Sequence, residues 1–375
     1  MNSIPAPCYV LEMDKLRVNL ELIHSVEERA DISIILALKA FSMWRVFPFV
    51  KQYLSGATAS SLNEARLIYE EMGVKAHTYA PVYRPDEFAD LLKYSSHLTF
   101  NSISQYEQFK DYVIGNTAVS FGIRVNPEWS PVETDLYNPA AAGSRLGVTP
   151  AAFEDGLPAG IDGVHFHVLC ESSAEDLMTA LDALEEKFAE QLQQAKWVNM
   201  GGGHLLTKHG YNQERLVEIL TNFKKKYDIE IVLEPGSAIA WQVGDLHTTV
   251  LDIVNNQGIQ TAMLDISFTA HLPDTLEMPY RPVVINASAK PIKNAYAYRL
   301  GGTSCLAGDY LAEYYFKEKL SIGDRIVLKD MIHYTMVKTN MFNGVPHPSI
   351  GILNEDGTFE LVREFNYEDY KSRLS

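Results

Sequence analysis

The chain has 375 residues, of which 46% are hydrophobic, and a formal net charge of −16 at pH 7. Negative charge of this size argues against general affinity for nucleic acids or anionic membranes, and no run of about 18 apolar residues could span a bilayer. Cys8, Cys170 and Cys305 have neither metal-ligand spacing nor an even disulfide pattern, which favours a reducing compartment. Because "MNSIPAPCYV" lacks a basic region followed by an apolar core, we expect no signal peptide and a cytoplasmic protein.

Strand-like and helix-like patterns alternate from residue 33 onward. Helical patterns fill most intervals, such as 61–73, which ends at Gly73, and 173–194. This alternation, with strands about 20–25 residues apart, predicts a (β/α)8 TIM barrel of the α/β class over residues 25–243. The long gap 127–162, rich in Pro, Gly and Ala, is predicted to be a loop over the barrel mouth. The eight expected strands are "SIILALK" (33–39), "ATAS" (57–60), "AHTYAPV" (76–82), "HLTFNS" (97–102), "AVSFGIRVN" (118–126), "GVHFHVL" (163–169), "WVNMGGG" (197–203) and "EIVLEPG" (230–236).

From about residue 244 the pattern changes to short β runs with few helical intervals. We therefore expect a C-terminal, mostly β domain over 244–375. The opening "PAPCYVLEMDKL" also reads as a strand, and it is predicted to join that domain, which then comprises 1–24 plus 244–375. The expected β runs are "DLHTTVLDIV" (245–254), "TAMLDIS" (261–267), "PVVINA" (282–287), "YAYRLGG" (296–302), "DRIVLKD" (324–330) and "YTMVKTN" (334–340).

Polar residues and glycines gather at the ends of the expected barrel strands, where barrels of this kind carry their chemistry. A lysine that reaches water or a satisfied core histidine explains any one of them, but explains poorly why they share one rim. In chain order they are Lys39, Arg124, His167, Gly201, Gly202, Gly203, Glu234 and Gly236.

Three of these features together fit pyridoxal 5'-phosphate. A lysine amine such as that of Lys39 forms a Schiff base with its aldehyde. Glycines 201–203, followed by a helix from about residue 212, let backbone N–H groups approach its phosphate. A carboxylate such as Glu234 keeps its ring nitrogen protonated, and His167 is placed to stack on the ring.

The whole chain resembles the fold-type III pyridoxal-phosphate decarboxylases, relatives of alanine racemase and ornithine decarboxylase. The likeness lies in "LALKAF", "GVHFHV", "GGG", "LEPG", "GGTSCLAGDY" (301–310) and "YTMVKTNMFNG" (334–344). It implies a homodimer with shared active sites, in which Cys305 returns a proton and Asp309 lies nearby at the substrate. It also implies that Tyr334 binds the phosphate and that Phe342 contacts the substrate.

Within the family, "ALKAFSMWRVFP", "NMGGGH" and "FNGVPHPSIGI" look most like the carboxynorspermidine decarboxylase branch. This likeness implies decarboxylation of carboxynorspermidine or carboxyspermidine, cationic carboxylated polyamines, to norspermidine or spermidine. One departure is Ser237, which follows "EPG" where ornithine- and diaminopimelate-type members have arginine. A hydroxyl donates a hydrogen bond but adds no positive charge, so the phosphate must depend more on backbone N–H groups.

Several roles stay open on sequence grounds. Asp274 and Glu277, in "HLPDTLEMPY", are either acceptors for substrate amines or ordinary loop charges. Cys170 either faces the phosphate or packs in the structure. Arg124 pairs either with an acid beside the cofactor or with a structural carboxylate.

Three alternative functions share some of these features. A diaminopimelate, ornithine or arginine decarboxylase, or a racemase, of the same fold would share Lys39 and Glu234. A metal-dependent barrel hydrolase could use His165 and His167, which alternate onto one side of a strand. Such sites need further His and Asp ligands at other strand ends, and His204 is the only further strand-end histidine. A non-catalytic homologue would typically lack the lysine or the cysteine loop. We expect no metal.

Overall fold

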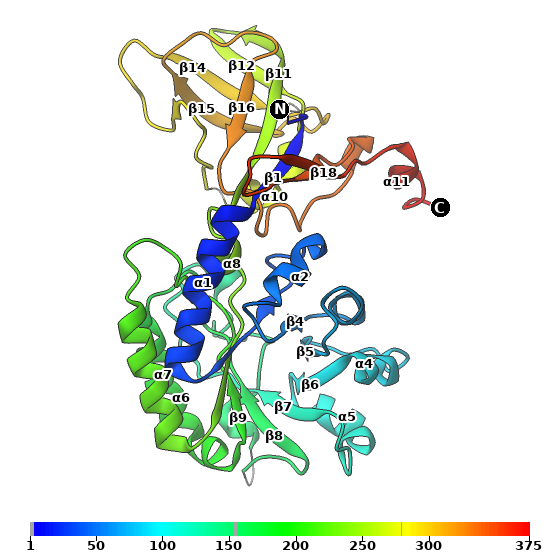
Figure 1. The fold of residues 1–375 in the computed structure, drawn as a ribbon, viewed down its shortest axis with the longest axis vertical. Helices are drawn as coiled ribbons and strands as arrows, with labels where there is room; N and C mark the ends of the chain where they lie inside the picture. The colour runs from blue at the N-terminus through cyan, green and yellow to red at the C-terminus, as the bar shows by residue number, and fades with distance from the viewer. Residues whose placement is uncertain (1–3, 154–155, 279) are drawn as a thin grey trace. The chain divides into compact units, whose positions relative to one another are not determined.

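The computed structural model describes residues 4–153, 156–278 and 280–375 (Figure 1). Residues 154–155 of the predicted 127–162 loop, and residues 1–3 of the predicted β domain, lie outside the described part. The chain forms two compact units, one of residues 19–239 and the other of residues up to Val18 together with Ala240–Ser375. None of the described helices is both long and apolar enough to cross a membrane.

The first unit contains a parallel sheet that returns on itself. β2 and β3 are two halves of one stretch that pair on opposite sides, β2 with β10 and β3 with β4, so nine labelled strands occupy eight positions of a ring. The predicted barrel is confirmed. Its strands are β2 (Ser33–Ile34), β3 (Leu36–Ala37), β4 (Ala57–Ala59), β5 (Ala76–Tyr79), β6 (Ser95–Phe100), β7 (Ser120–Arg124), β8 (Ile161–His165), β9 (Trp197–Asn199) and β10 (Glu230–Leu233).

Helices follow most of these strands and lie outside the ring (Figure 1). The three helices expected from the sequence are present. Ser61 caps the first, which ends at left-handed Gly73 after a π-helical turn, and a Ser173 capping box starts the second, which kinks at Phe188. The third begins at Gln213, after the N-cap residue Asn212. The helices are α1 (Met13–Ala30), α2 (Phe47–Val50), α3 (Leu62–Leu67), α4 (Phe88–Tyr94), α5 (Ile103–Val113), α6 (Ala174–Gln194), α7 (Gln213–Tyr227) and α8 (Ser237–Ala240).

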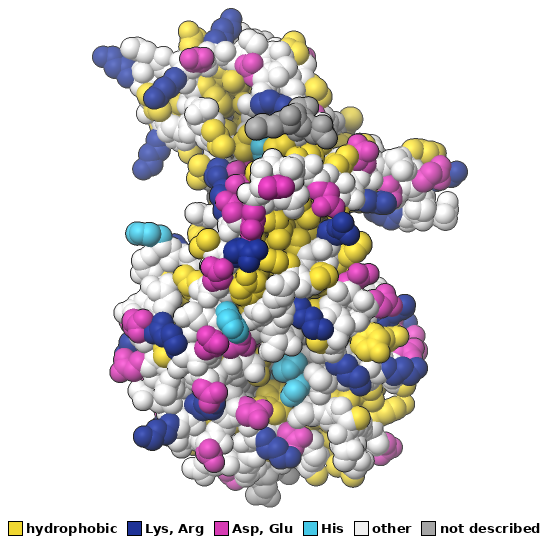
Figure 2. Space-filling view, in the orientation of Figure 1, with side chains coloured by type: hydrophobic (Ala, Val, Ile, Leu, Met, Phe, Trp, Pro, Cys, Tyr) yellow, Lys and Arg dark blue, Asp and Glu magenta, His cyan; other side chains and the backbone are white. Residues whose placement is uncertain are grey.

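A tryptophan fills part of the barrel interior. Trp197 of β9 is buried, and its indole N–H donates to the Ser120 hydroxyl at 2.8 Å. A Cβ on Gly163 would lie 2.0 Å from this ring and one on Gly122 would lie 2.3 Å from it, so β8 and β7, the next two strands of the ring, both need glycine here. Basic and acidic side chains intersperse over the barrel face shown in Figure 2, as expected for a surface in contact with water.

The second unit is built on a mixed sheet in the order β13-β15-β14-β12-β11-β1-β17-β18, with β16 also paired to β11. The N-terminal strand joins this sheet between β11 and β17, as predicted. Its strands are β1 (Cys8–Glu12), β11 (Gly244–Asn256), β12 (Ile259–Leu264), β13 (Ala287–Ser288), β14 (Tyr296–Gly301), β15 (Tyr310–Phe316), β16 (Arg325–Leu328), β17 (Ser349–Leu353) and β18 (Phe359–Arg363). Its short helices are α9 (Phe268–His271), α10 (Pro273–Glu277) and α11 (Tyr367–Lys371).

Two predicted β runs of this unit are wrong. Residues 334–340 form turns, because the Thr335 hydroxyl donates to Asp274 and the Asn340 N–H donates to the Ala270 carbonyl. Residues 282–287 contribute only an isolated bridge, Val284 to Leu328, and the start of β13. Three strands were not predicted: β15, β17 and β18.

Candidate active site

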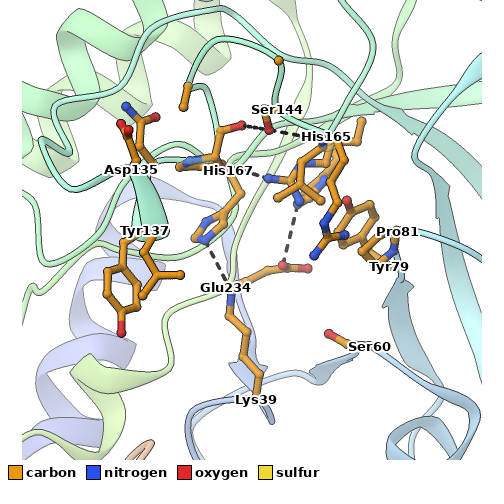
Figure 3. Close-up of a pocket in the computed structure, with 18 of the residues that line it drawn as sticks. Lys39, Ser60, Tyr79, Pro81, Asp135, Tyr137, Ser144, His165, His167 and Glu234 are labelled. Carbon is orange, nitrogen blue, oxygen red and sulfur yellow. Dashed lines mark hydrogen bonds and ion pairs between the residues drawn. The ribbon is translucent and has the colours of Figure 1, made fainter. Parts of the chain in front are cut away.

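Lys39 lies in the turn directly after β3, at the C-terminal end of the strand. Residues 34–38 are buried, and the lysine side chain extends from them into a cavity (Figure 3). Its Nζ is 3.4 Å from Nε2 of His167. Burial lowers the pKa of Lys39, although the Glu234 carboxylate opposes the shift. A lowered pKa increases the fraction of neutral amine, which is the form that attacks a carbonyl carbon.

His167 follows β8 and is held from three sides. Its Nδ1 accepts the Gly202 N–H at 3.0 Å, so in the neutral ring the hydrogen sits on Nε2, the nitrogen that faces Lys39. Arg124 Nη2 donates to the His167 carbonyl at 3.1 Å. Burial, followed by the charges of Lys39 and Arg124, lowers the pKa of His167 well below its usual value. The ring is therefore a neutral, fixed wall of the cavity.

Glu234 directly follows β10, which pairs with β9 on one side and with β2 on the other. Its Oε1 accepts a hydrogen bond from Asn199 Nδ2 at 2.6 Å, and the Thr58 side chain lies near the same carboxylate. Its Oε2 lies 3.9 Å from Nε2 of His165 (Figure 3). Burial raises the pKa of Glu234, while Asn199 and Lys39 act in the opposite direction. A buried carboxylate in this setting is suited to a cationic partner that enters the cavity.

The glycine loop after β9 cannot carry side chains without moving its neighbours. Gly201 and Gly203 have left-handed φ angles of +66° and +93°. A Cβ on Gly202 would lie 2.4 Å from the Glu234 carbonyl oxygen, and one on Gly203 would lie 2.1 Å from the Leu169 carbonyl oxygen. The predicted glycine loop thus has a steric basis in the structure.

A second close approach lies beside it at the start of α8. A Cβ on Gly236 would lie 2.4 Å from the Cβ of Ala40. Within the described residues, no hydrogen-bond acceptor is found for the N–H groups of Gly203, Gly236 and Ser237. Backbone donors without acceptors, at glycines where the chain packs closely, suit a bound phosphate. The residues present therefore fit the phosphate group of pyridoxal phosphate.

The cavity has a volume of about 700 Å³ and is walled partly by the β7–β8 connection. This volume falls within the range of roughly 300–1,000 Å³ found for small-molecule sites. The described residues of this connection form short 3₁₀ turns and no α-helix. One turn, Asp135–Tyr137, lines the cavity together with residues 141–146 (Figure 3). Asp135 was not predicted, because nothing in the sequence separates it from neighbouring acids such as Glu133.

Arg124 and Cys170, whose roles the sequence leaves open, occupy different surroundings. Arg124 is buried in the cavity wall, with its guanidinium 4.7 Å from the centre of the Tyr79 ring. Cys170 is exposed, its N–H donates to Ser172 Oγ at 3.1 Å, and it is not among the residues that line the cavity. Although the residue is exposed, its thiol is partly desolvated by the surrounding protein; this desolvation, followed by the charge of Glu171, raises the pKa of Cys170. A raised pKa favours the thiol form.

In the second unit, Asp309 organises the loop that carries Cys305. The buried Asp309 carboxylate accepts the Thr269 N–H at 2.9 Å on Oδ1, and the Ser304 N–H at 3.0 Å and hydroxyl at 2.6 Å on Oδ2. The Cys305 N–H donates to Asn343 Oδ1 at 2.8 Å, which ties the loop to the "FNG" segment. Cys305 itself is exposed. Within its own unit, Asp309 is thus a structural residue of the cysteine loop.

The other predicted residues of this unit have partners close by. Asp274 accepts hydrogen bonds from the Tyr280 hydroxyl at 2.9 Å and the Thr335 hydroxyl at 2.7 Å. Glu277 forms an ion pair with Lys338. Tyr334 lies in a turn with a left-handed φ of +49°, and Phe342, on the 3₁₀ turn Phe342–Gly344, is 45% exposed.

The described residues contain no group of three or more His, Cys, Asp or Glu side chains that could hold a metal ion. His165, His167 and His204 in particular do not form such a group. His167 is instead engaged with Gly202 and Lys39. The metal-dependent hydrolase hypothesis therefore has no site in the described structure.

Comparison with known proteins gives one consistent result. A family model described as "Pyridoxal-dependent decarboxylase, C-terminal sheet domain" matches residues 8–332. Over the full chain and 96% of the relative, the sequence is 49% identical to carboxyaminopropylagmatine decarboxylase of Synechocystis sp.. It is 43% identical to carboxynorspermidine/carboxyspermidine decarboxylase of Campylobacter jejuni, over 99% of each chain.

Solved structures agree. The crystal structure of Campylobacter jejuni carboxynorspermidine decarboxylase complexed with norspermidine matches with a TM-score of 0.91 and 42% identity, over 99% of this chain and 100% of that one. Diaminopimelate decarboxylase from Helicobacter pylori, complexed with L-lysine, matches with a TM-score of 0.82 over 99% of this chain and 98% of that one. At 18% identity, the latter likeness shows a shared fold alone.

Proposed function

The chain belongs to the pyridoxal-dependent decarboxylases, and we propose that it decarboxylates carboxynorspermidine or carboxyspermidine in polyamine biosynthesis. The observation that carries the proposal is the convergence of Lys39, His167 and Glu234 on one cavity, in a chain 43% identical over nearly its full length to an enzyme with that name. The cofactor of the family is pyridoxal 5'-phosphate, which when bound supplies an electron sink for the electron pair left on the substrate carbon as carbon dioxide departs.

The residues of the barrel divide the work of holding that cofactor. The Lys39 amine, whose pKa is lowered by burial, would hold its aldehyde carbon. Glu234 would hold a proton on its ring nitrogen, and His167, fixed by Gly202, would support the face of its ring. The N–H groups at Gly203, Gly236 and Ser237 would hold its phosphate, with help from the hydroxyl of Tyr334.

Reduction with borohydride should attach the cofactor to the peptide that contains Lys39, and its attachment elsewhere would contradict the role assigned to Lys39.

Two further residues, Arg124 and Cys170, are assigned supporting roles. Arg124 would orient His167 through its bond to the carbonyl of that residue. Cys170, on the same segment, would lie beside the phosphate. Both are proposals that a cofactor-bound crystal structure can check directly.

The proton returned to the substrate carbon would come from the partner subunit's Cys305, in a homodimer with shared active sites. Support for this assignment comes from the exposed position of Cys305 on a loop fixed by Asp309 and Asn343. Mixing inactive Lys39→Ala and Cys305→Ala proteins should restore about a quarter of wild-type activity, because mixed dimers contain one intact site. No recovery after subunit exchange would contradict shared sites.

A cationic triamine needs acceptors for its amines. Asp135 is the acid of the β7–β8 loop that lines the cavity, and we place it first among the candidates. Asp274 and Glu277 remain candidates, although each has a hydrogen-bond or ion-pair partner within its own unit. Phe342 would contact the methylene chain between the amines, since 45% of its surface is exposed.

A second candidate substrate is carboxyaminopropylagmatine. One observation favours it: the 49% identity to the Synechocystis enzyme of that name exceeds the 43% identity to the Campylobacter enzyme. The two kinds of substrate differ at the tail: carboxyaminopropylagmatine ends in a guanidinium group, whereas carboxynorspermidine and carboxyspermidine end in an ammonium group. Both cations suit a carboxylate such as Asp135.

Carbon dioxide release from carboxynorspermidine, carboxyspermidine, carboxyaminopropylagmatine, diaminopimelate and ornithine, compared by kcat/KM, tests the assignment. We expect one of the first two to be preferred. Preference for the guanidinium compound would replace the first candidate with the second, and turnover of diaminopimelate alone would refute both. We also propose a cytoplasmic location, and that the two units correspond to the domains predicted at 25–243 and at 1–24 with 244–375.

A further inference from the structure

His165, the last residue of β8, is a buried polar group without a partner. Its imidazole lines the active-site cavity, and among the described residues neither ring nitrogen has a hydrogen-bond partner. Burial, followed by the charges of Arg124 and Lys39 and by the neighbouring His77, lowers its pKa well below the usual value, so the ring is neutral. Buried polar groups in native proteins are nearly always hydrogen-bonded, so an unpaired imidazole here points to a partner gained in the working state.

An acceptor close to the imidazole is the carboxylate of Glu234. His165 Nε2 lies 3.9 Å from Glu234 Oε2, about 1 Å beyond a normal hydrogen bond (Figure 3). On its other side, the imidazole packs against the Tyr79 ring, with the centres 5.1 Å apart. Because Asn199 already holds Oε1 at 2.6 Å, a small rotation of the carboxylate about that bond would close the gap to His165.

We propose that His165 is a positioning residue: its Nε2–H donates to Glu234 when the cofactor is bound, and holds that carboxylate ionised and directed at the ring nitrogen. This inference rests on the proposed cofactor role of Glu234. Hydrogen bonds donated to a carboxylate favour its ionised form, which opposes the effect of burial on Glu234. Asn199 supplies one such bond to Oε1, and His165 supplies a second to Oε2.

The neutral state of His165 is part of the role. An imidazolium beside Glu234 would neutralise the carboxylate and leave no unbalanced charge for a protonated cofactor ring. Burial, followed by the charges of Arg124 and Lys39, which face the same interior, keeps the imidazole uncharged. A neutral donor therefore orients Glu234 while the charge of the carboxylate stays available to the cofactor.

The test compares wild type with His165→Phe, which keeps a flat ring against Tyr79 but removes the donor. With pyridoxal phosphate labelled with ¹⁵N in the ring, the wild type should show the chemical shift of a protonated pyridine. His165→Phe should move this shift towards the unprotonated value and weaken cofactor affinity about tenfold. For the carbon analogue, in which CH replaces the ring nitrogen, the two proteins should bind equally, because Glu234 has no proton to hold.

The inference is overturned if His165→Phe keeps the wild-type shift and affinity, or if it loses the same factor for both ligands, since that would be a packing effect. His165→Gln places an amide donor near the same point and should stay within about threefold of wild type. If His165→Phe does not fold, His165→Gln decides: a folded variant with an unprotonated ring nitrogen refutes the role. His97→Phe, at an interior histidine that does not line the cavity, should leave affinity unchanged. Failure of the wild type to bind pyridoxal phosphate would instead refute the proposed function.

Discussion

Two glycines on one loop allow the steric basis of the phosphate site to be measured. Gly203 and Gly210 both follow β9 and have similar left-handed φ angles, +93° and +82°. A Cβ on Gly210 would meet nothing within 4 Å, whereas one on Gly203 would lie 2.1 Å from the Leu169 carbonyl oxygen. Alanine at either position must adopt a left-handed conformation, which costs about 1–2 kcal/mol. Only alanine at Gly203 must also displace backbone.

The difference between the two variants therefore isolates the close contact. Overpacking typically costs about 1–3 kcal/mol, so Gly203→Ala should lower the free energy of unfolding by about 2–5 kcal/mol and Gly210→Ala by about 1–2 kcal/mol. Because the Gly203 N–H is one of the proposed phosphate donors, Gly203→Ala should also weaken cofactor binding about tenfold or more, which corresponds to about 1.4 kcal/mol.

Urea unfolding of the cofactor-free proteins, followed by circular dichroism, gives the stability difference. Quenching of tryptophan fluorescence on addition of pyridoxal phosphate gives the affinity. If Gly203→Ala is no less stable than Gly210→Ala and binds the cofactor equally well, the close packing of this loop and its role as a phosphate cradle are both refuted.

Three further outcomes are expected. In the cofactor-free protein at about pH 8, Lys39 should react with acetic anhydride faster than the surface residue Lys225, since burial lowers its pKa and leaves more neutral amine at that pH; equal rates by peptide mass spectrometry would contradict the shift. Asp309→Ala should reduce stability by about 2–4 kcal/mol, because three donors lose a buried acceptor, and a melting temperature equal to that of wild type would exclude the structural role. Asp135→Asn should raise KM for the triamine about tenfold with little change in kcat, whereas Glu133→Gln on the same loop should not; a fall in kcat alone would exclude tail binding.

The barrel and the centre of its site could be predicted from the sequence because both depend on periodic features. Alternating strands and helices set the parallel ring, and in such a ring every strand ends at the same rim. Lys39, His167 and Glu234 could therefore be placed together although they are distant in sequence. The structure brings all three to one cavity.

What could not be predicted depends on long-range contacts. Residues 334–340 read as a strand from their β-branched and aromatic content, but in the structure their polar groups bond to the 270–277 region, which overrides propensity. Asp135 belongs to a connection without periodicity, so only the folded structure places it at the cavity. The sequence indicates His165 only as a possible metal ligand. Its lack of hydrogen-bond partners among the described residues indicates a different role, the positioning of Glu234.

The pairing of β2 with β10 joins the first and last strands of the ring, and it has a consequence for how the enzyme is made. The Ala37 N–H, two residues before Lys39, donates to the Pro235 carbonyl, one residue after Glu234, at 3.1 Å. A nascent chain that stops before residue 230 thus has the amine but lacks the acid and the last wall. During refolding, binding of pyridoxal phosphate should accordingly lag behind helix formation. The yellow absorbance of the bound cofactor would then report the closure of the barrel.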